Sequence, residues 1–406
     1  MKTKVAIIGT VGLPARYGGF ETLTAHLVEE LSDTYDFTVY CSSKKYSREE
    51  RKESWKGSRL KYIPLEANGI QSIFYDSWSI LHALRCSDVL LILGVAGAWL
   101  LPFVRLFTNK KIIISIDGIE WKRDKWPLAA KLYLWWAENL AVKYSHIDIS
   151  DNESIQDYTS LRYETISRVI EYGADHTKLN VFPSEQDLIT YPFLSKSYAV
   201  KVCRIEPENN VSTILKVFSE NPEHHLVVVG NWENSPYGKD LKRTFSVFEN
   251  ISILDPIYDQ HTLDIIRGNA SLYIHGHSAG GTNPSLVEAM FLGLPVISYG
   301  VSYNRTTTGD QAFYFSNEEE LKILLKTLTK NDLKNCSLKM KKIAKNKYVW
   351  KTVAEKYSQV IQESFSVTKK NDVYPEISKL DQEVLAKYNV NHLQNIQLFN
   401  NAKSRI

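Results

Sequence analysis

Short apolar runs alternate with amphipathic stretches along most of this 406-residue chain, and this alternation constrains the fold more than any other feature. Near-continuous apolar runs are typical of parallel strands that are covered by helices on both faces. In the first half of the chain, the predicted strands are 5–8, 37–41, 60–64, 89–93 and 112–116. In the second half, they are 198–203, 226–229, 251–254, 272–275 and 296–299. The pattern therefore predicts an α/β fold of two doubly wound parallel-sheet domains, with ligands beyond the carboxyl ends of the strands.

The length allows two such domains, each with a core of its own. We expect a first domain at 1–173, a second at 174–350, and a returning helix with a polar tail at 351–406. A net charge of +3 is too small to indicate nucleic-acid binding. The four cysteines are far apart and lack the spacing of a metal site, which favours reduced thiols in the cytoplasm.

Neither of the two apolar segments near the N-terminus has the form of a membrane or export signal. The run in MKTKVAIIGT is short and stops at a glycine loop, so we expect no signal peptide. Residues 89–104 fall short of the ~20 apolar residues of a spanning helix and contain Gly94, Gly97 and Pro102. They predict a buried strand, a turn and a short helix instead.

The segment HGHSAGGTNPSLVEAMFLGLPVISYG, residues 275–300, carries the strongest indication of a site. A strand end and a glycine-rich loop lead to Asn283 and Pro284, which suit the N-cap and the first helical position. Gly293 is placed to end the helix. A helix start leaves amide groups unpaired, here expected at 285–287, and such groups bind phosphate.

Glu288 is expected to lean back toward this loop, because helical side chains point toward the N-terminus of their helix. Amides that hold phosphate beside a carboxylate that holds a sugar hydroxyl would suit a nucleotide sugar. An ordinary capped helix of an α/β domain explains the same residues equally well. On the residues alone, both interpretations remain open.

The same segment resembles the donor-binding motif of glycosyltransferase family 4, retaining enzymes of the GT-B fold, in which two Rossmann-like domains face a central cleft. The family motif has two glutamates separated by seven residues; Glu288 matches the second, whereas Gly280 replaces the first. GGTNPSLVEAM, together with LPARYGGFE near the N-terminus, is similar to bacterial rhamnosyltransferases of capsule and cell-wall polysaccharide synthesis. The donor-binding residues expected from the motifs and the resemblance are Gly18, Gly19, Arg204, Asn209, His275, His277, Gly281, Thr282, Asn283, Ser285, Leu286 and Glu288.

Arg204 matches the arginine of the family's Arg and Lys pair, which neutralises the diphosphate leaving group, but Asn209 stands at the lysine position. A guanidinium can hold two phosphate oxygens at once, which favours Arg204 as the main stabiliser of developing charge. The expected catalytic residues are Asp117, Asp151, Tyr172 and Arg204. The expected acceptor-binding residues are Arg16, Tyr17 and Glu120.

Each of these assignments has a structural alternative. Gly18 and Gly19 could form a packing turn, Asp117 and Glu120 could be solvated loop carboxylates, and Asp151 could cap a helix. Tyr172 could be a packing residue between the domains. No DxD pair or other metal ligand set is apparent, so metal-independent chemistry is expected.

Mixed basic and aromatic residues mark two stretches of the first half and suit a membrane surface with anionic lipid. They are Trp99, Phe103, Arg105 and Phe107, and then Lys122, Arg123, Lys125 and Trp126. Core packing explains most of these aromatics equally well. A peripheral position on the inner membrane face is expected because the resemblance implies a lipid-linked acceptor.

The resemblance implies transfer of L-rhamnose from dTDP-L-rhamnose to a polyprenyl-diphosphate-linked sugar, with retention of configuration and without a cofactor. Two alternatives remain. One is a GT-B nucleotide-sugar epimerase or hydrolase that needs no lipid acceptor. The other is a non-catalytic sugar-nucleotide-binding subunit, which the missing glutamate and lysine would suit.

Overall fold

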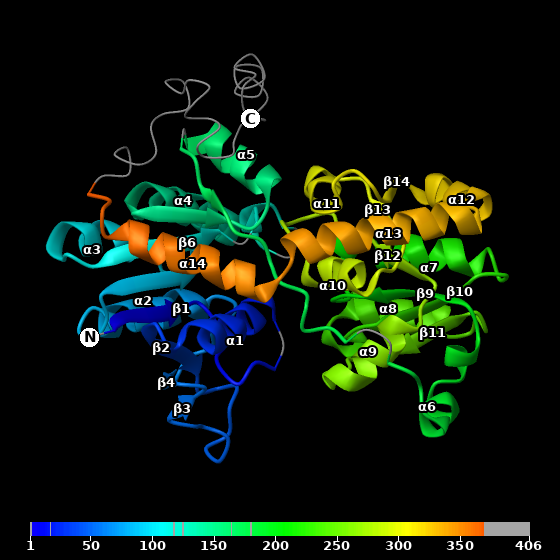
Figure 1. Ribbon diagram of the computed structural model, residues 1–406, viewed down its shortest axis with the longest axis horizontal. Coiled ribbons are helices and arrows are strands. Elements are labelled where there is room, and N and C mark those ends of the chain that lie inside the picture. Colours follow the sequence, from blue (N-terminus) through cyan, green and yellow to red (C-terminus); the bar gives the residue numbers. More distant parts are fainter. Residues whose placement is uncertain are drawn as a thin grey trace. The chain divides into compact units, whose positions relative to one another are not determined.

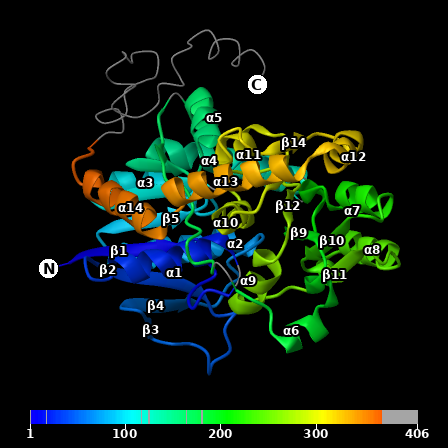
Figure 2. The ribbon, with the colours of Figure 1, turned by 45° about the vertical axis from the view of Figure 1, so that its right-hand side comes forward.

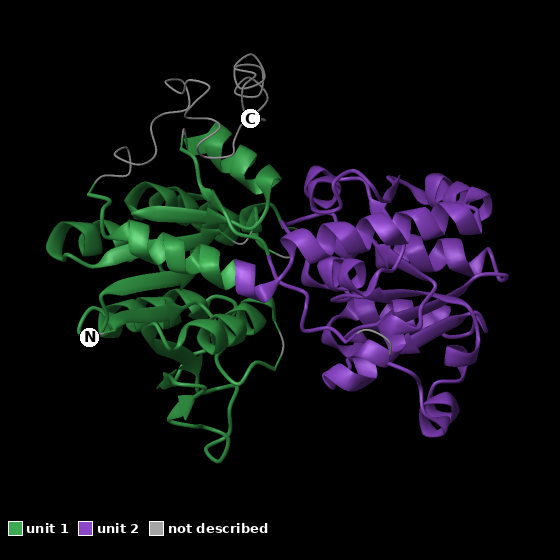
Figure 3. Ribbon diagram, in the orientation of Figure 1, with its two compact units in different colours: residues 1–171, 353–406 green, residues 172–352 purple. Residues whose placement is uncertain are grey.

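The computed structural model describes residues 2–16, 18–116, 118–123, 126–163, 165–178 and 181–368. The predicted site residues Tyr17 and Asp117 therefore lie outside the described residues, as does Lys125. The chain divides into two compact units, one of residues 1–171 with 353–406 and one of residues 172–352 (Figure 3).

The first unit is built on an eight-stranded sheet of order β3-β4-β2-β1-β5-β6-β7-β8 (Figure 1). Every neighbouring pair is parallel except β3 and β4. Its strands are β1 (Thr3–Ile8), β2 (Tyr35–Ser42), β3 (Ser54–Trp55), β4 (Ser58–Ile63), β5 (Val89–Leu93), β6 (Lys111–Ile116), β7 (Ile147–Ser150) and β8 (Arg168–Val169). Its helices are α1 (Gly19–Leu31), α2 (Gln71–Ala83), η1 (Ala98–Leu100), α3 (Leu101–Phe107), η2 (Glu120–Lys122), α4 (Leu128–Tyr144), α5 (Glu153–Tyr163) and most of α14 (Trp350–Ser364).

The second unit has a six-stranded, all-parallel sheet of order β11-β10-β9-β12-β13-β14. Its strands are β9 (Tyr198–Val202), β10 (His225–Val229), β11 (Ile251–Leu254), β12 (Leu272–His275), β13 (Val296–Tyr299) and β14 (Phe313–Phe315). Its helices are α6 (Glu185–Thr190), η3 (Pro192–Ser195), η4 (Pro207–Asn209), α7 (Val211–Ser219), η5 (Trp232–Asn234), α8 (Pro236–Phe245), α9 (Gln260–Gly268), α10 (Pro284–Leu292), α11 (Ser302–Thr307), α12 (Glu318–Thr327) and α13 (Lys330–Lys347). Helix α13 packs along α10 in both views (Figures 1 and 2).

The predicted fold class is confirmed, because both sheets are almost wholly parallel and are covered by helices. At the centre of the first sheet, β5 is buried along its whole length and β1 from Val5 onward, which explains their near-continuous apolar sequences. Helices α2, α3 and α4 pack on one face of this sheet through a shared apolar cluster. The short apolar segment 89–104 forms β5, η1 and the start of α3, as the sequence predicts.

The returning helix α14 is part of the first unit's core from Val353 onward. Tyr35 shares a hydrogen bond of 2.8 Å with the Ser358 hydroxyl, and Arg168 forms an ion pair of 3.0 Å with Glu363. The first unit is therefore assembled from two separate parts of the chain.

Each sheet has one point at which its strand order reverses, and these points determine where ligands bind in doubly wound folds. In the first sheet, successive strands run outward in opposite directions from β1 and β5. In the second sheet, they do so from β9 and β12. The loops that follow these four strands are the expected positions for ligands.

Candidate functional site

The loop after β12 leads directly into α10, and this local structure follows the sequence prediction. Asn283 caps the helix, with its side chain accepting a hydrogen bond from the Ser285 amide, and Pro284 is the first helical residue. Gly293 ends the helix in the left-handed conformation at φ 77°, which glycine adopts without steric cost. The loop 276–283 is thereby held at the switch point between β9 and β12.

The predicted phosphate-binding amides of residues 285–287 are not unpaired, so this part of the prediction is wrong. Asn283 Oδ1 accepts the Ser285 N–H at 3.0 Å. The Asn283 carbonyl accepts the N–H groups of Leu286 at 3.0 Å and Val287 at 3.3 Å. The capping residue thus satisfies the very amides that a helix start otherwise leaves without partners. In the described structure, the amides of Gly280 and Gly281 donate to no described protein atom.

Two asparagines join this loop to the one that follows β9. Asn209 donates to the Arg204 carbonyl at 2.8 Å, and its Oδ1 accepts from His277 Nδ1 at 3.0 Å. Asn210 donates to the Gly276 carbonyl at 2.8 Å. The two switch-point loops are therefore fixed side by side. The contact of Asn209 with the donor stays a prediction, since its side-chain amide has a second N–H.

Arg204 is a predicted site residue whose side chain is free to bind a ligand, as far as the described residues show. It follows β9, is exposed, and its guanidinium forms no ion pair or hydrogen bond with any described residue. Only its carbonyl is engaged, by the amide of Glu206 and the side chain of Asn209. A free guanidinium at the carboxyl end of a central strand can bind a phosphate without first breaking an internal bond.

The remaining predicted donor residues of this unit lie in or directly under the loop. His275 is 3 % exposed and stacks on Tyr273, whereas His277 is 7 % exposed. Burial lowers the pKa of His275 well below its usual value, and the charge of Lys201 adds to this effect, so the imidazole is neutral. Thr282 is 7 % exposed, and the Leu286 side chain is fully buried. His275 and Leu286 thus support the loop from below, while Gly281 and Ser285 are partly accessible.

Glu288 lies at the centre of a network that the sequence did not reveal. One carboxylate oxygen pairs with Arg267 of α9, and the other accepts from His176 Nε2 at 3.1 Å. The Arg267 side chain is 1 % exposed and that of Glu288 is 12 % exposed. Asp264 lies 3.8 Å from the same guanidinium. Glu288 is therefore held in one orientation by two partners from distant parts of the chain.

Trp350 determines which nitrogen of His176 carries the proton. The indole Nε1–H donates to His176 Nδ1 at 3.0 Å, and because an indole nitrogen can only donate, Nδ1 must accept. The hydrogen of the neutral ring then lies on Nε2, which donates to Glu288. Tyr172 packs its ring on Trp350 at 4.7 Å between centroids, and a catalytic role for Tyr172 stays a prediction.

The ionisation of Glu288 reflects a competition between burial and its partners. Burial by itself raises the pKa of this carboxyl, but the Arg267 charge and the His176 hydrogen bond outweigh burial and lower the pKa from 4.5 to about 2. The carboxylate is therefore charged at any physiological pH, so it can accept a hydrogen bond from a hydroxyl but cannot act as a general acid.

In the first unit, the loop after β1 is organised by Glu21. Its carboxylate accepts from the Thr10 hydroxyl at 3.0 Å and from the Val11 amide at 2.6 Å. Gly18 precedes α1 with φ 132° and ψ 147°, and a Cβ there would lie 1.8 Å from Glu21 Oε2. Gly18 is therefore required by the Glu21 side chain as well as by its own backbone conformation.

We expect Gly18→Ala to lower the free energy of unfolding by more than about 2 kcal/mol, because alanine meets both the strained φ and Glu21. Gly69→Ala is the matched control, since Gly69 also has a positive φ of 71°, but a Cβ added there would meet no atom within 4 Å. Its cost should be about 1 kcal/mol. Urea unfolding of both variants checks the difference, and equal losses would contradict the role assigned to Glu21.

Two other predicted residues of the first unit, Arg16 and Glu120, are engaged by side chains of the same unit. Arg16 pairs with Glu50 and lies over the Tyr46 ring at 4.8 Å. Glu120 accepts from Arg123 and from the Trp126 indole, both at 2.9 Å. Glu120 and Arg123 thus stabilise the segment after β6. Contact with an acceptor remains a prediction for Arg16 and Glu120.

Asp151 follows β7 and lies near Tyr357 of α14, whose phenol pKa rises above its usual value because of burial and, to a smaller extent, the Asp151 charge. The catalytic role of Asp151 stays a prediction, and so does its alternative role as a helix cap.

Four residues around Glu288 and the loop 276–283 were not predicted from the sequence. They are His176, Lys201, Arg267 and Trp350. The sequence could have pointed to Lys201, because a lysine interrupts the apolar run YAVKV of a strand that is covered on both faces. The other three residues act through partners far away in sequence, so no local pattern identifies them.

Two kinds of feature are absent from the described part of the chain. No group of three or more His, Cys, Asp or Glu side chains there could hold a metal ion, and metal independence stays a prediction. No described helix is both long and apolar enough to cross a bilayer.

Residues 192–348, which include both loops of the second unit's switch point, match the family model described as glycosyl transferases group 1. This protein is a glycosyltransferase. Residues 2–175 of the glycosyltransferase match a second model, described as a domain of unknown function, DUF1972. No curated protein matches its sequence.

Solved structures place the glycosyltransferase in the GT-B fold class. A sucrose-phosphate synthase from Thermosynechococcus elongatus has a TM-score of 0.73 at 14% identity, over 90% of this chain and 100% of that one. HepE from Anabaena, solved with UDP-glucose, has a TM-score of 0.67 at 13% identity, over 89% of this chain and 99% of that one. An Escherichia coli protein bound to UDP-2-fluoro glucose has a TM-score of 0.68 at 10% identity, over 90% and 100% of the two chains. At these identities the likeness establishes the fold.

Proposed function

We propose that this glycosyltransferase moves L-rhamnose from dTDP-L-rhamnose to a polyprenyl-diphosphate-linked sugar, with retention of configuration. The observation that carries the proposal is the Arg204 guanidinium, which pairs with no described residue and follows β9 at the switch point of the group 1 domain, where the loop 276–283 also lies. The structural neighbours solved with UDP-glucose and UDP-2-fluoro glucose support a nucleotide sugar as the donor. Rhamnose itself is supported only by the sequence resemblance of GGTNPSLVEAM and LPARYGGFE.

In the proposed reaction, the acceptor hydroxyl oxygen forms a bond to the anomeric carbon while the bond to the diphosphate oxygen breaks. Arg204 and the amides of Gly280 and Gly281 stabilise the charge that develops on the departing diphosphate. The hydroxyl proton passes to an oxygen of that diphosphate, so no protein base and no metal is required. Glu288, held as a carboxylate, accepts a hydrogen bond from a hydroxyl of the donor.

We also propose that helices α2, α3 and α4 bind the surface of a membrane that contains anionic lipid, at its cytoplasmic face. Their outer sides carry large exposed apolar residues, which are Phe74, Trp78, Leu81, Phe103, Leu106, Phe107, Leu128, Leu132, Trp135 and Trp136. All residues of these three helices are described, and their only carboxylates, Asp76 and Glu138, are 3 % and 2 % exposed. Exposed apolar residues without exposed acids suit such a surface.

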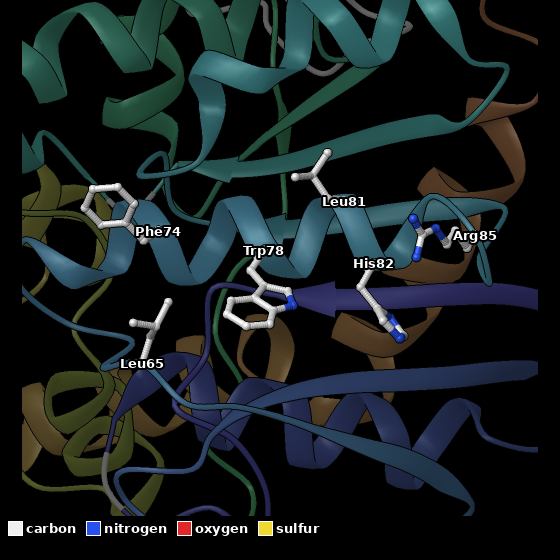
Figure 4. A pocket seen from close by; sticks show the side chains of 6 residues that line it. All are labelled: Leu65, Phe74, Trp78, Leu81, His82 and Arg85. Atoms are coloured by element: carbon white, nitrogen blue, oxygen red, sulfur yellow. The ribbon is translucent and has the colours of Figure 1, made fainter.

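A groove on α2 adds to this surface. It has a volume of about 620 Å³ and is lined by Leu65, Phe74, Trp78, Leu81, His82 and Arg85 (Figure 4). Phe74, Trp78 and Leu81 lie along α2, Leu65 comes from the segment after β4, and Arg85 stands just beyond the C-terminal end of α2 (Figure 4). An apolar groove with a cation at one end fits a lipid chain with an anionic head group, which supports a lipid-linked acceptor.

A transfer assay tests the proposed reaction. The purified full chain is incubated with dTDP-L-rhamnose, UDP-glucose or other nucleotide sugars, with and without lipid-linked glucose or N-acetylglucosamine. The expected result is release of dTDP and a rhamnosylated lipid only when both substrates are present. Turnover without acceptor would favour an epimerase or hydrolase, and nucleotide binding without turnover would favour a non-catalytic subunit.

Vesicle flotation tests the membrane surface. The double variant Leu106→Ser and Phe107→Ser should bind phosphatidylglycerol vesicles at least about tenfold more weakly than the wild type, because two side chains of about 1.5–3 kcal/mol each no longer enter the lipid. Both residues are 74% exposed, so folding should be unaffected. Val247→Ser is a control of equal exposure in the other unit. Unchanged binding by the double variant would refute this surface.

A further inference from the structure

Lys201 lies inside β9 and is one of the most deeply buried charged side chains of the second unit. It is 2 % exposed, and burial lowers the pKa of its ammonium group. Its Nζ reaches the start of the loop 276–283, because a Cβ added to Gly276 would lie only 3.0 Å from it. The lysine tip therefore lies against the first residue of this loop, beside the Asn209 carbonyl, which a Cβ at residue 276 would meet at 2.2 Å.

No carboxylate of the described chain forms an ion pair with this ammonium group, although buried charges in proteins are normally paired. The titratable groups that act on Lys201 or are acted on by it are the Cys203 thiol and the neutral imidazole of His275. The thiol gives partial compensation through a side-chain hydrogen bond. A buried cation that lacks an anionic partner in the folded chain indicates a partner that arrives with a ligand.

The surroundings of Lys201 indicate which anion this is. Arg204 follows three residues later on the same strand end and has no partner of its own among the described side chains. The amides of Gly280 and Gly281 belong to the loop that begins above the lysine tip. Asn209, which stands where a second cation was expected, carries no charge, and its side chain bonds to the Arg204 carbonyl and to His277. The loop pair would thus offer a diphosphate only one cation unless Lys201 takes part.

We propose that Lys201 supplies the second positive charge for the donor diphosphate, approaching it from beneath Gly276 while Arg204 binds from the exposed side. This inference rests on the proposed function, because it assigns a residue to the same donor site. It explains why a lysine stands in a strand whose other residues are apolar.

Isothermal titration of dTDP, UDP and thymidine into the full-length wild type and Lys201→Met tests the assignment. We expect the variant to bind the preferred nucleoside diphosphate about 10- to 100-fold more weakly, since one charge-assisted phosphate contact is lost. Thymidine, which lacks phosphate, should bind both proteins equally. Lys216→Met is the control, since Lys216 is half exposed and pairs with Glu318.

Thermal unfolding of the ligand-free proteins separates this role from a structural one. Methionine fills a similar volume without a charge, so Lys201→Met should melt at the same temperature as the wild type or above it. A lower melting temperature with equal losses for diphosphate and nucleoside would overturn the assignment, and so would unchanged diphosphate affinity. If the wild type binds neither dTDP nor UDP, the proposed function itself fails.

Discussion

Replacing Arg267 by methionine is expected to lower the free energy of unfolding of this glycosyltransferase by about 3–5 kcal/mol. The loss arises because Glu288, 12 % exposed, would remain as a buried carboxylate with only the neutral His176 beside it. Urea unfolding at pH 7 measures the effect. Arg243→Met is the matched control, because Arg243 is 83% exposed and its ion pair with Asp240 should contribute less than about 1 kcal/mol.

The effect of Arg267→Met should depend on pH in a defined direction. In the wild type, the Glu288 pKa is lowered from 4.5 to about 2, so its stabilising contribution is complete above pH 4.5 and is lost as pH falls toward 2. In the variant, burial dominates and the pKa rises, so acid neutralises the unpaired carboxyl. The difference in stability between the two proteins should therefore be largest near pH 7 and shrink below about pH 4.

Adding Glu288→Gln to Arg267→Met removes both charges and should recover part of the lost stability, whereas independent sites would give additive losses. Additivity of the two changes would show that the Arg267 and Glu288 side chains do not depend on each other in the folded protein.

Replacing Arg204 by alanine is expected to reduce kcat about 10²- to 10³-fold, the usual cost of removing one group that stabilises developing negative charge. Stability should change by less than about 0.5 kcal/mol, because the exposed guanidinium has no partner among the described residues. Steady-state kinetics with saturating acceptor, together with thermal unfolding, measure both quantities.

Arg204→Lys and Arg243→Ala complete this experiment. Lysine keeps the charge but cannot bind two phosphate oxygens in one plane, so Arg204→Lys should recover only part of the lost rate. Arg243→Ala, a change of another exposed arginine in the same unit, should leave kcat unchanged. An unaltered kcat in Arg204→Ala would remove Arg204 from the reaction.

The sequence predicted most of the fold because the relevant patterns are local. The near-continuous apolar strands and the capping residues Asn283, Pro284 and Gly293 act within a few positions of themselves. Strand ends such as 251–254, 272–275 and 296–299 agree with β11, β12 and β13 to the residue. The same locality placed Arg204 at a strand end, where no described side chain pairs with it.

The contacts that determine the chemistry of Glu288 could not be predicted in this way. His176 and Glu288 are 112 residues apart, and Trp350 lies 174 residues from His176, so their contacts exist only after the chain has folded. The pairing of the 285–287 amides was missed for a different reason. For Ser285 it depends on the rotamer of Asn283, whose side chain could equally have pointed to solvent, whereas the Leu286 and Val287 amides bond to the Asn283 backbone carbonyl.

The division of the first unit between the two ends of the chain has a consequence for its biosynthesis. The second unit spans residues 172–352, so it is complete once the first residues of α14 have been translated and before the rest of that helix. The first unit, although synthesised earlier, still lacks most of α14 at that stage, and its surface around Tyr35 and Arg168 stays uncovered on the ribosome. A nonsense mutation just after residue 352 would therefore damage the N-terminal half of the molecule and spare the half that directly precedes the stop codon.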